Sequence, residues 1–278
     1  MCGSSKFFAR LVPFLLPALG VAPALAAQPE AITINSQLIV KSRPLSPPSG
    51  TPAASASVLL MAGGNGVLNL DPNGDVQELQ GNFLIRSSYR FLSDGLNVAM
   101  LDAAPTYPDP NGFNNQRHTH QHADLVAKAL ETVRTVWPSV PVWLVGTSSG
   151  TISVANVAAR SGQSPSALKG IVLTSSVTQP ANTPGASVMS LSPGLSSIKV
   201  PTLVVWHSAD SCPGSPSGGA HAVYTSLTGL SSGMKAETVI KGGGWVAMPA
   251  CSALGYHGYS GVEDEVVAAI VKFISAHP

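Results

Sequence analysis

Charged residues are scarce in this sequence, and neither sign of charge dominates. Lysine and arginine together number 15 and aspartate and glutamate 14, so the formal net charge at pH 7 is +1. A chain without a basic excess has no electrostatic basis for binding nucleic acid. Hydrophobic residues make up 44% of the 278 residues, which is enough for a core and argues against a disordered chain. Because no internal repeat is found, this length indicates one large domain.

A long unbroken hydrophobic run is also missing. The apolar segment 11–25 contains three prolines, which disfavour a stable membrane-spanning helix. It follows a short basic region ending at Arg10 and precedes a small-x-small pattern at residues 24–26, an arrangement typical of a cleaved secretory signal. We therefore predict a signal peptide over residues 1–26, one domain over residues 27–278, and a secreted or periplasmic location. A retained membrane anchor is the alternative.

Cysteine is rare, with 3 in the whole chain. Removal of the predicted signal peptide would take Cys2 away and leave Cys212 and Cys251. An even pair in an exported protein is a candidate disulfide, and two free thiols are the alternative.

Around the three closely spaced histidines His118, His120 and His122, no cysteine and no acidic cluster completes a metal site. Their alternate spacing would suit ligands on a strand, but residues 123–136 have a plainly helical pattern. We interpret the histidines as the solvated start of this helix, with a metal site as the alternative. We expect no metal and no organic cofactor.

The middle of the chain contains a run that is rich in glycine and serine. Five apolar residues, 141–145, lead into Gly146-Thr147-Ser148-Ser149-Gly150, and a helical run of small residues follows. This G-x-S-x-G pattern predicts a strand, a tight turn and a helix, with Ser148 in a strained conformation at the apex and glycines where side chains would collide. A Ser/Gly loop without a special role is the alternative.

Predicted strands and helices alternate along the chain. Because strands joined by helices pair in parallel, this order predicts an α/β fold with a mostly parallel sheet covered on both faces. The connection from residue 175 to 200 is too short for a sizeable lid domain. The predicted strands are Ala31–Lys41 (as one or two), Val58–Ala62, Leu96–Leu101, Gly170–Thr174, Pro201–Trp206 and Glu237–Ile240, and the predicted helices include Asn82–Leu92, Gly218–Leu230 and Val262–Ser275.

The strand Val58–Ala62 ends in Gly63-Gly64-Asn65-Gly66, a loop that lets the backbone approach another group closely. In a serine hydrolase this loop supplies a backbone N–H to the oxyanion hole. We assign that role first to Gly64 and second to Asn65, with the N–H of Ser149 as the other donor. A plain turn after the strand is the alternative.

A serine nucleophile needs a histidine to take its proton and a carboxylate to orient that histidine. No aspartate or glutamate occurs between residues 132 and 209, and Glu237 is the only other acid between Asp210 and His257. Asp210 follows a predicted strand at the sheet edge where Ser148 also emerges, whereas Glu237 begins a strand. His257 lies in the loop between the last predicted strand and helix, where the base belongs.

The order Ser148, Asp210, His257 is the one found in α/β-hydrolases, and the chain resembles that superfamily from Ala31 to its end. More narrowly, it resembles a family of secreted bacterial hydrolases with three motifs. These are a Gly-Gly-Asn-Gly oxyanion loop, an Asn-Phe-Leu-x-Arg-Ser helix and a Val-Trp-Leu-Val-Gly-Thr-Ser elbow, here residues 63–66, 82–87 and 142–148. The resemblance implies the fold and the triad more than a named reaction, since most members have no assigned substrate.

These residues together predict a serine hydrolase that cleaves small-molecule or polymeric carboxylic esters through an acyl-enzyme. A peptidase, amidase or acyltransferase with the same triad is one alternative, and a non-catalytic binding protein is the other. A bridge between Cys212 and Cys251 would tie together the loops that hold Asp210 and His257.

Overall fold

The computed structural model describes most of the chain after the predicted signal peptide, which itself lies outside the described residues. Within the described part, no helix is both long enough and apolar enough to span a lipid bilayer. The described residues are 30–35, 38–43, 53–103, 111–161, 168–180, 186–244 and 248–278.

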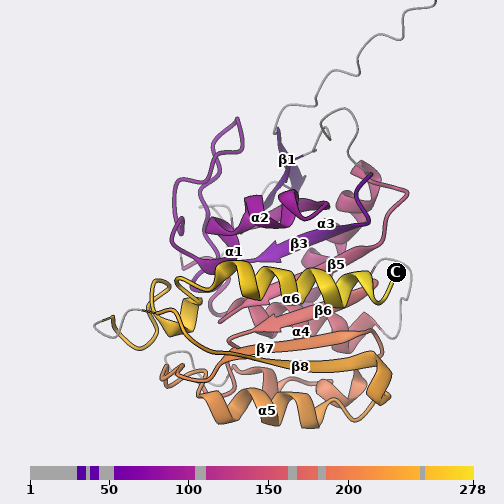
Figure 1. Cartoon of the computed structure of the whole chain (residues 1–278). Helices are drawn as coiled ribbons and strands as arrows, with labels where there is room; N and C mark the ends of the chain where they lie inside the picture. Colours follow the sequence, from indigo (N-terminus) through magenta and orange to yellow (C-terminus); the bar gives the residue numbers. More distant parts are fainter. Residues whose placement is uncertain are drawn as a thin grey trace, which may run out of the picture.

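An eight-stranded sheet forms the centre of the molecule (Figure 1). Its strand order is β1-β2-β4-β3-β5-β6-β7-β8. The strands from β4 to β8 in this order run parallel, and β2 and β1 continue the sheet as antiparallel strands at one edge. The strands are β1 Glu30–Asn35, β2 Leu38–Arg43, β3 Ala56–Met61, β4 Leu96–Ala103, β5 Val142–Thr147, β6 Gly170–Thr174, β7 Thr202–His207 and β8 Lys235–Ile240.

Helices cover both faces of the sheet, which confirms the predicted fold class (Figure 1). Alternate residues of β3 show the two cores: Leu59 and Met61 pack with α3, α4 and α5, whereas Val58 and Leu60 pack with α1, α2 and α6. The central strands β3 to β6 are buried along their whole length, as expected for strands covered twice. The helices are α1 Phe83–Arg86, α2 Ser88–Ser93, α3 His120–Val136, α4 Gly150–Ser161, α5 Ser217–Ser226 and α6 Glu263–Ser275.

The single helix predicted over Asn82–Leu92 is wrong, because the structure divides it into α1 and α2. The break falls at buried Ser87, whose N–H closes the last turn of α1 on the carbonyl oxygens of Phe83 and Ile85. Serine competes with helical hydrogen bonding and favours such end positions. The helix predicted over Gly218–Leu230 also ends earlier, at Ser226.

The connection between β6 and β7 contains no lid in its described part. It holds only two short 3₁₀ helices, Val188–Ser190 and Leu195–Ser197. The carboxyl edge of the parallel strands, where ligands bind in open α/β sheets, is therefore not covered by a domain inserted at this point.

Candidate active site

Ser148 lies in the turn between β5 and α4 with a φ of 52°, a left-handed conformation that residues with side chains rarely adopt. Gly146 and Gly150, which flank this turn, have no room for a side chain. A Cβ on Gly146 would lie 2.8 Å from the carbonyl oxygen of Gly150, and a Cβ on Gly150 would lie 2.1 Å from that of Met61. The structure thus confirms the predicted strand, tight turn and helix around Ser148.

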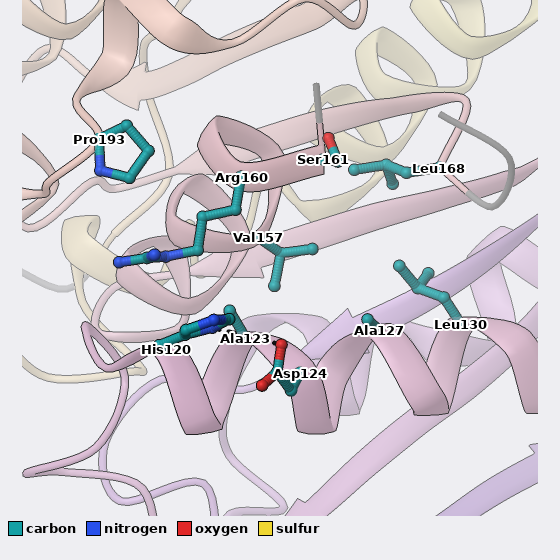
Figure 2. A pocket seen from close by; sticks show the side chains of 10 residues that line it. All are labelled: His120, Ala123, Asp124, Ala127, Leu130, Val157, Arg160, Ser161, Leu168 and Pro193. Carbon is teal, nitrogen blue, oxygen red and sulfur yellow. Dashed lines mark ion pairs between the residues drawn. The ribbon is translucent and has the colours of Figure 1, made fainter. Parts of the chain in front are cut away.

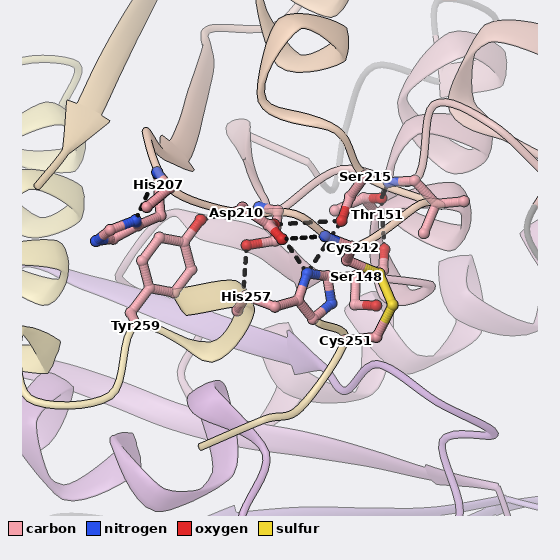
Figure 3. A network of polar contacts seen from close by, with 12 residues as sticks. Ser148, Thr151, His207, Asp210, Cys212, Ser215, Cys251, His257 and Tyr259 are labelled. Carbon is pink, nitrogen blue, oxygen red and sulfur yellow. Dashed lines mark hydrogen bonds and ion pairs between the residues drawn. A yellow bond between two sulfur atoms is a disulfide. The ribbon is translucent and has the colours of Figure 1, made fainter. Parts of the chain in front are cut away.

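His257 and Asp210 form a buried pair near this turn (Figure 3). His257 belongs to a short 3₁₀ helix, Tyr256–Gly258, and its Nδ1 lies 2.9 Å from Oδ2 of Asp210, which follows β7. The exposed fractions of the two residues are only 6% and 5%. Because Nδ1 donates to the carboxylate, the second ring nitrogen, Nε2, is left to accept a proton.

Ser215 is a third member of this cluster, and the sequence analysis missed it. Its hydroxyl lies 3.0 Å from Nδ1 of His257 and donates to Oδ2 of Asp210 at 3.3 Å (Figure 3). The residue is 4% exposed. Nothing in the sequence distinguishes Ser215 from the many other serines, because its position depends on the turn in which its N–H donates to the carbonyl oxygen of Cys212.

His207, which precedes Asp210 by three residues, is turned away from the pair. Its Nε2 lies 2.7 Å from the carbonyl oxygen of Gly242, and its Nδ1 accepts from the N–H of Ala209. Both ring nitrogens of His207 therefore already have backbone partners.

Ser148 and His257 line one cavity of about 320 Å³, and Figure 3 shows Ser148 beside the imidazole ring. The described structure contains no hydrogen bond between their side chains. Serine and histidine in unliganded sites often move into hydrogen-bond range only when substrate binds. The other lining residues are Gly63, Gly64, Leu79, Gly81, Asn82, Phe83, Thr147, Cys251, Ala253 and Gly258.

The glycine loop after β3 lies directly against the serine. A Cβ on Gly63 would lie 2.9 Å from the Cβ of Ser148, so only glycine fits there. Gly64 lines the cavity and has a φ of 60°. The side chain of Asn65 instead accepts from the N–H of Val67. Within the described residues, the N–H groups of Gly64 and Ser149 donate no hydrogen bond.

A buried arginine forms hydrogen bonds to the backbone of this loop. Arg117 donates to the carbonyl oxygens of Ala62 and Gly64, each at 3.0 Å, and to the hydroxyl of Ser153 at 2.9 Å. It is 1% exposed, and no carboxylate of the described residues pairs with it. Burial lowers the pKa of Arg117 to about 9, so it still carries its charge at neutral pH.

The expectation that His118, His120 and His122 are all solvated is wrong for His122. Its ring is fully buried, and Nε2 lies 2.8 Å from the hydroxyl of Ser153. His122 faces the sheet because it lies on the same side of α3 as its other buried residues. Burial lowers the pKa of His122 to about 3, so the ring is neutral. The described residues contain no group of three side chains suited to a metal ion.

A second pocket, of about 370 Å³, lies between α3 and α4 (Figure 2). It is lined by apolar side chains together with Arg160 and with His120 and Asp124, which form an exposed ion pair at 3.3 Å. None of the predicted site residues lines this pocket.

A disulfide joins Cys212 to Cys251, as predicted. The N–H of Cys212 donates to Oδ1 of Asp210 at 2.9 Å, and Cys251 lines the cavity beside His257. The bridge therefore ties the segment that carries the carboxylate to the segment that leads to the imidazole. Closure of 39 residues contributes about 3–4 kcal/mol to the free energy of unfolding in the chain-entropy model.

Comparison with known proteins identifies the fold. No protein-family model matches the sequence, and no curated protein matches it. Among solved structures, a thermostable carboxyl esterase from Bacillus coagulans aligns with a TM-score of 0.60 and 13% identity, over 90% of this chain and 98% of that one. An α/β serine hydrolase homologue from Coxiella burnetii aligns with a TM-score of 0.56 and 16% identity, over 90% and 99%.

A lidless α/β serine hydrolase from Xanthomonas campestris aligns with a TM-score of 0.54 and 12% identity, over 86% of this chain and 88% of that one. Each of these three alignments covers at least 86% of this chain and at least 88% of the other chain. The chain therefore has the α/β-hydrolase fold, and the residues that the structure describes contain no lid domain.

Proposed function

We propose that this protein is a serine hydrolase that cleaves carboxylic esters with Ser148 as nucleophile, His257 as base and Asp210 as the residue that orients the base. The observation that carries this proposal is the buried pair of His257 and Asp210 beside a serine held in a strained turn. Two structural neighbours, a carboxyl esterase and an α/β serine hydrolase, support the same reaction class.

In the proposed reaction, the hydroxyl oxygen of Ser148 attacks the acyl carbon while Nε2 of His257 takes its proton. Asp210 stabilises the resulting imidazolium through Nδ1. The carbonyl oxygen becomes negatively charged and accepts hydrogen bonds from the N–H groups of Ser149 and of Gly64 or Asn65. His257 then protonates the leaving alcohol, and water releases the acyl group from Ser148 by the same steps.

We also propose that the mature protein begins after residue 26 and works outside the cytoplasm. The disulfide supports this location, because such bonds persist in oxidising compartments. Because the described part of the β6–β7 connection contains no lid, the site would admit the ester bond of a bulky or polymeric substrate as well as that of a small molecule.

The proposal is tested by exposing the purified mature protein briefly to a serine-reactive fluorophosphonate and measuring intact mass. We expect one adduct on the parent protein and none on Ser148→Ala, because only an activated serine reacts quickly. If the folded parent remains unlabelled, a binding protein on the same fold becomes the better interpretation. If the parent is labelled, rates on matched ester and amide substrates would separate an esterase from a peptidase or amidase.

A further inference from the structure

Asn82 lies at the N-terminus of α1 and also lines the cavity that Ser148 and His257 line. Its side-chain oxygen Oδ1 accepts from the N–H of Leu84 at 3.1 Å, which makes Asn82 the N-cap of the helix. This bond distinguishes the two ends of the amide, since only the oxygen can accept a hydrogen bond. The amide nitrogen Nδ2 must therefore point away from the helix.

The amide nitrogen faces the serine across Gly63. A Cβ placed on Gly63 would lie 3.4 Å from Nδ2 of Asn82 and 2.9 Å from the Cβ of Ser148. The two side chains thus flank the same point of the glycine loop. Within the described residues, Nδ2 has no hydrogen-bond partner, so two N–H donors are available beside the nucleophile.

The position of this amide is rigid. The neighbouring Phe83 is buried and packs against Tyr259, with ring centroids 4.9 Å apart. Tyr259 is itself fixed by hydrogen bonds to Val205 and Ser175. A donor that is already in place costs no rearrangement when charge develops in the transition state.

We infer that Asn82 is a further catalytic residue of the site, an inference that rests on the proposed hydrolase function. When Ser148 attacks, the electron pair of the acyl C=O bond moves to its oxygen. Nδ2 of Asn82 donates a hydrogen bond to this oxygen, in addition to the backbone N–H groups. The choice of residue fits this role, because serine, threonine or aspartate would cap α1 as well, but only asparagine retains free N–H donors after capping.

Two variants separate the donor from the cap. Asn82→Ser and Asn82→Asp both keep an oxygen that can cap α1, but neither retains the N–H donor at neutral pH. We expect kcat for ester hydrolysis to fall about 100- to 1,000-fold in Asn82→Ser with a much smaller change in KM, as for other oxyanion donors. Asn82→Asp should fall further, because its negative charge repels the oxyanion. The thermal midpoint should stay close to that of the parent in both.

Asn73→Asp is the matched control, since it makes the same change at an exposed asparagine outside the cavity, and it should retain parental kcat. A parental kcat in Asn82→Ser would reduce Asn82 to a helix cap and overturn the inference. If the parent protein itself neither hydrolyses esters nor reacts with the fluorophosphonate, the proposed function fails and the inference fails with it. An active parent with unaffected Asn82 variants would instead contradict the inference alone.

Discussion

Ser215 shares its hydroxyl between the two members of the Asp210–His257 pair. In the proposed reaction it would touch no reacting atom and would act as a positioning residue, because its hydroxyl contacts both side chains. We expect Ser215→Ala to lower kcat/KM about tenfold, the equivalent of one hydrogen bond to a charged group. Steady-state kinetics would measure this effect.

Ser215→Thr supplies the control, because threonine keeps the hydroxyl and should restore most of the activity. An Ser215→Ala variant with parental kcat/KM would show that the carboxylate alone positions His257.

His122 makes the stability of the protein depend on pH. Its folded-state pKa of about 3 lies below the ordinary value of about 6.5, so the unfolded chain binds one more proton between these values. The free energy of unfolding is therefore unaffected by His122 above pH 6.5 and decreases below it, by up to about 1.4 kcal/mol per pH unit.

Urea denaturation of His122→Gln between pH 7 and pH 4 would check this expectation. The glutamine does not titrate, so the decrease of stability with falling pH should be shallower than in the parent. His120→Gln makes the same replacement at an exposed position of the same helix, so comparing the two slopes separates the buried ring from a general effect of the substitution. Equal slopes for His122→Gln and the parent would contradict the prediction.

At the scale of elements, Arg86 anchors α1 to two distant segments of the chain. Its guanidinium donates to the carbonyl oxygens of Gly81, Ala253 and Gly258 and pairs with Glu263 at 2.9 Å. One side chain thus connects α1 to the segment that carries His257 and to the start of α6. The side chain is only 17% exposed, so these bonds are poorly replaced by water.

We expect Arg86→Ala to lower the free energy of unfolding by about 2–4 kcal/mol and to reduce activity, because the segment around His257 loses its anchor. Arg90→Ala is the comparison, since Arg90 pairs with the exposed Asp264 on α6 and such surface pairs contribute about 0–1 kcal/mol. Chemical denaturation of both variants measures the difference. Equal destabilisation by the two substitutions would show that the contacts of Arg86 contribute no more to stability than an exposed ion pair does.

At the scale of the whole molecule, the fold could be predicted, and candidate site residues could be selected, because the alternatives are few. The scarcity of acids leaves Asp210 as the one carboxylate at a suitable strand end, and chain order then selects His257. Two cysteines outside the predicted signal permit a single pairing. The spacing of glycines around Ser148 reflects a local steric requirement, which is visible in five consecutive residues.

The features that could not be predicted depend on contacts between distant parts of the chain. Arg86 meets Gly258, which lies 172 residues away, and this contact accompanies the early end of α1. His122 is buried because Ser153, 31 residues away, offers it a hydroxyl group inside the core. In the sequence, nothing distinguishes Asn82 from an ordinary helix cap; only the structure shows that it lies near Ser148. Local patterns carry no information about such partners.

The bridge between Cys212 and Cys251 also makes the completeness of the candidate site depend on the redox compartment. In a reducing cytoplasm both thiols stay free, and the segments that carry Asp210 and His257 are held together by weaker contacts alone. For a protein exported as proposed, the covalent link between these two segments forms only once the chain has left the cytoplasm.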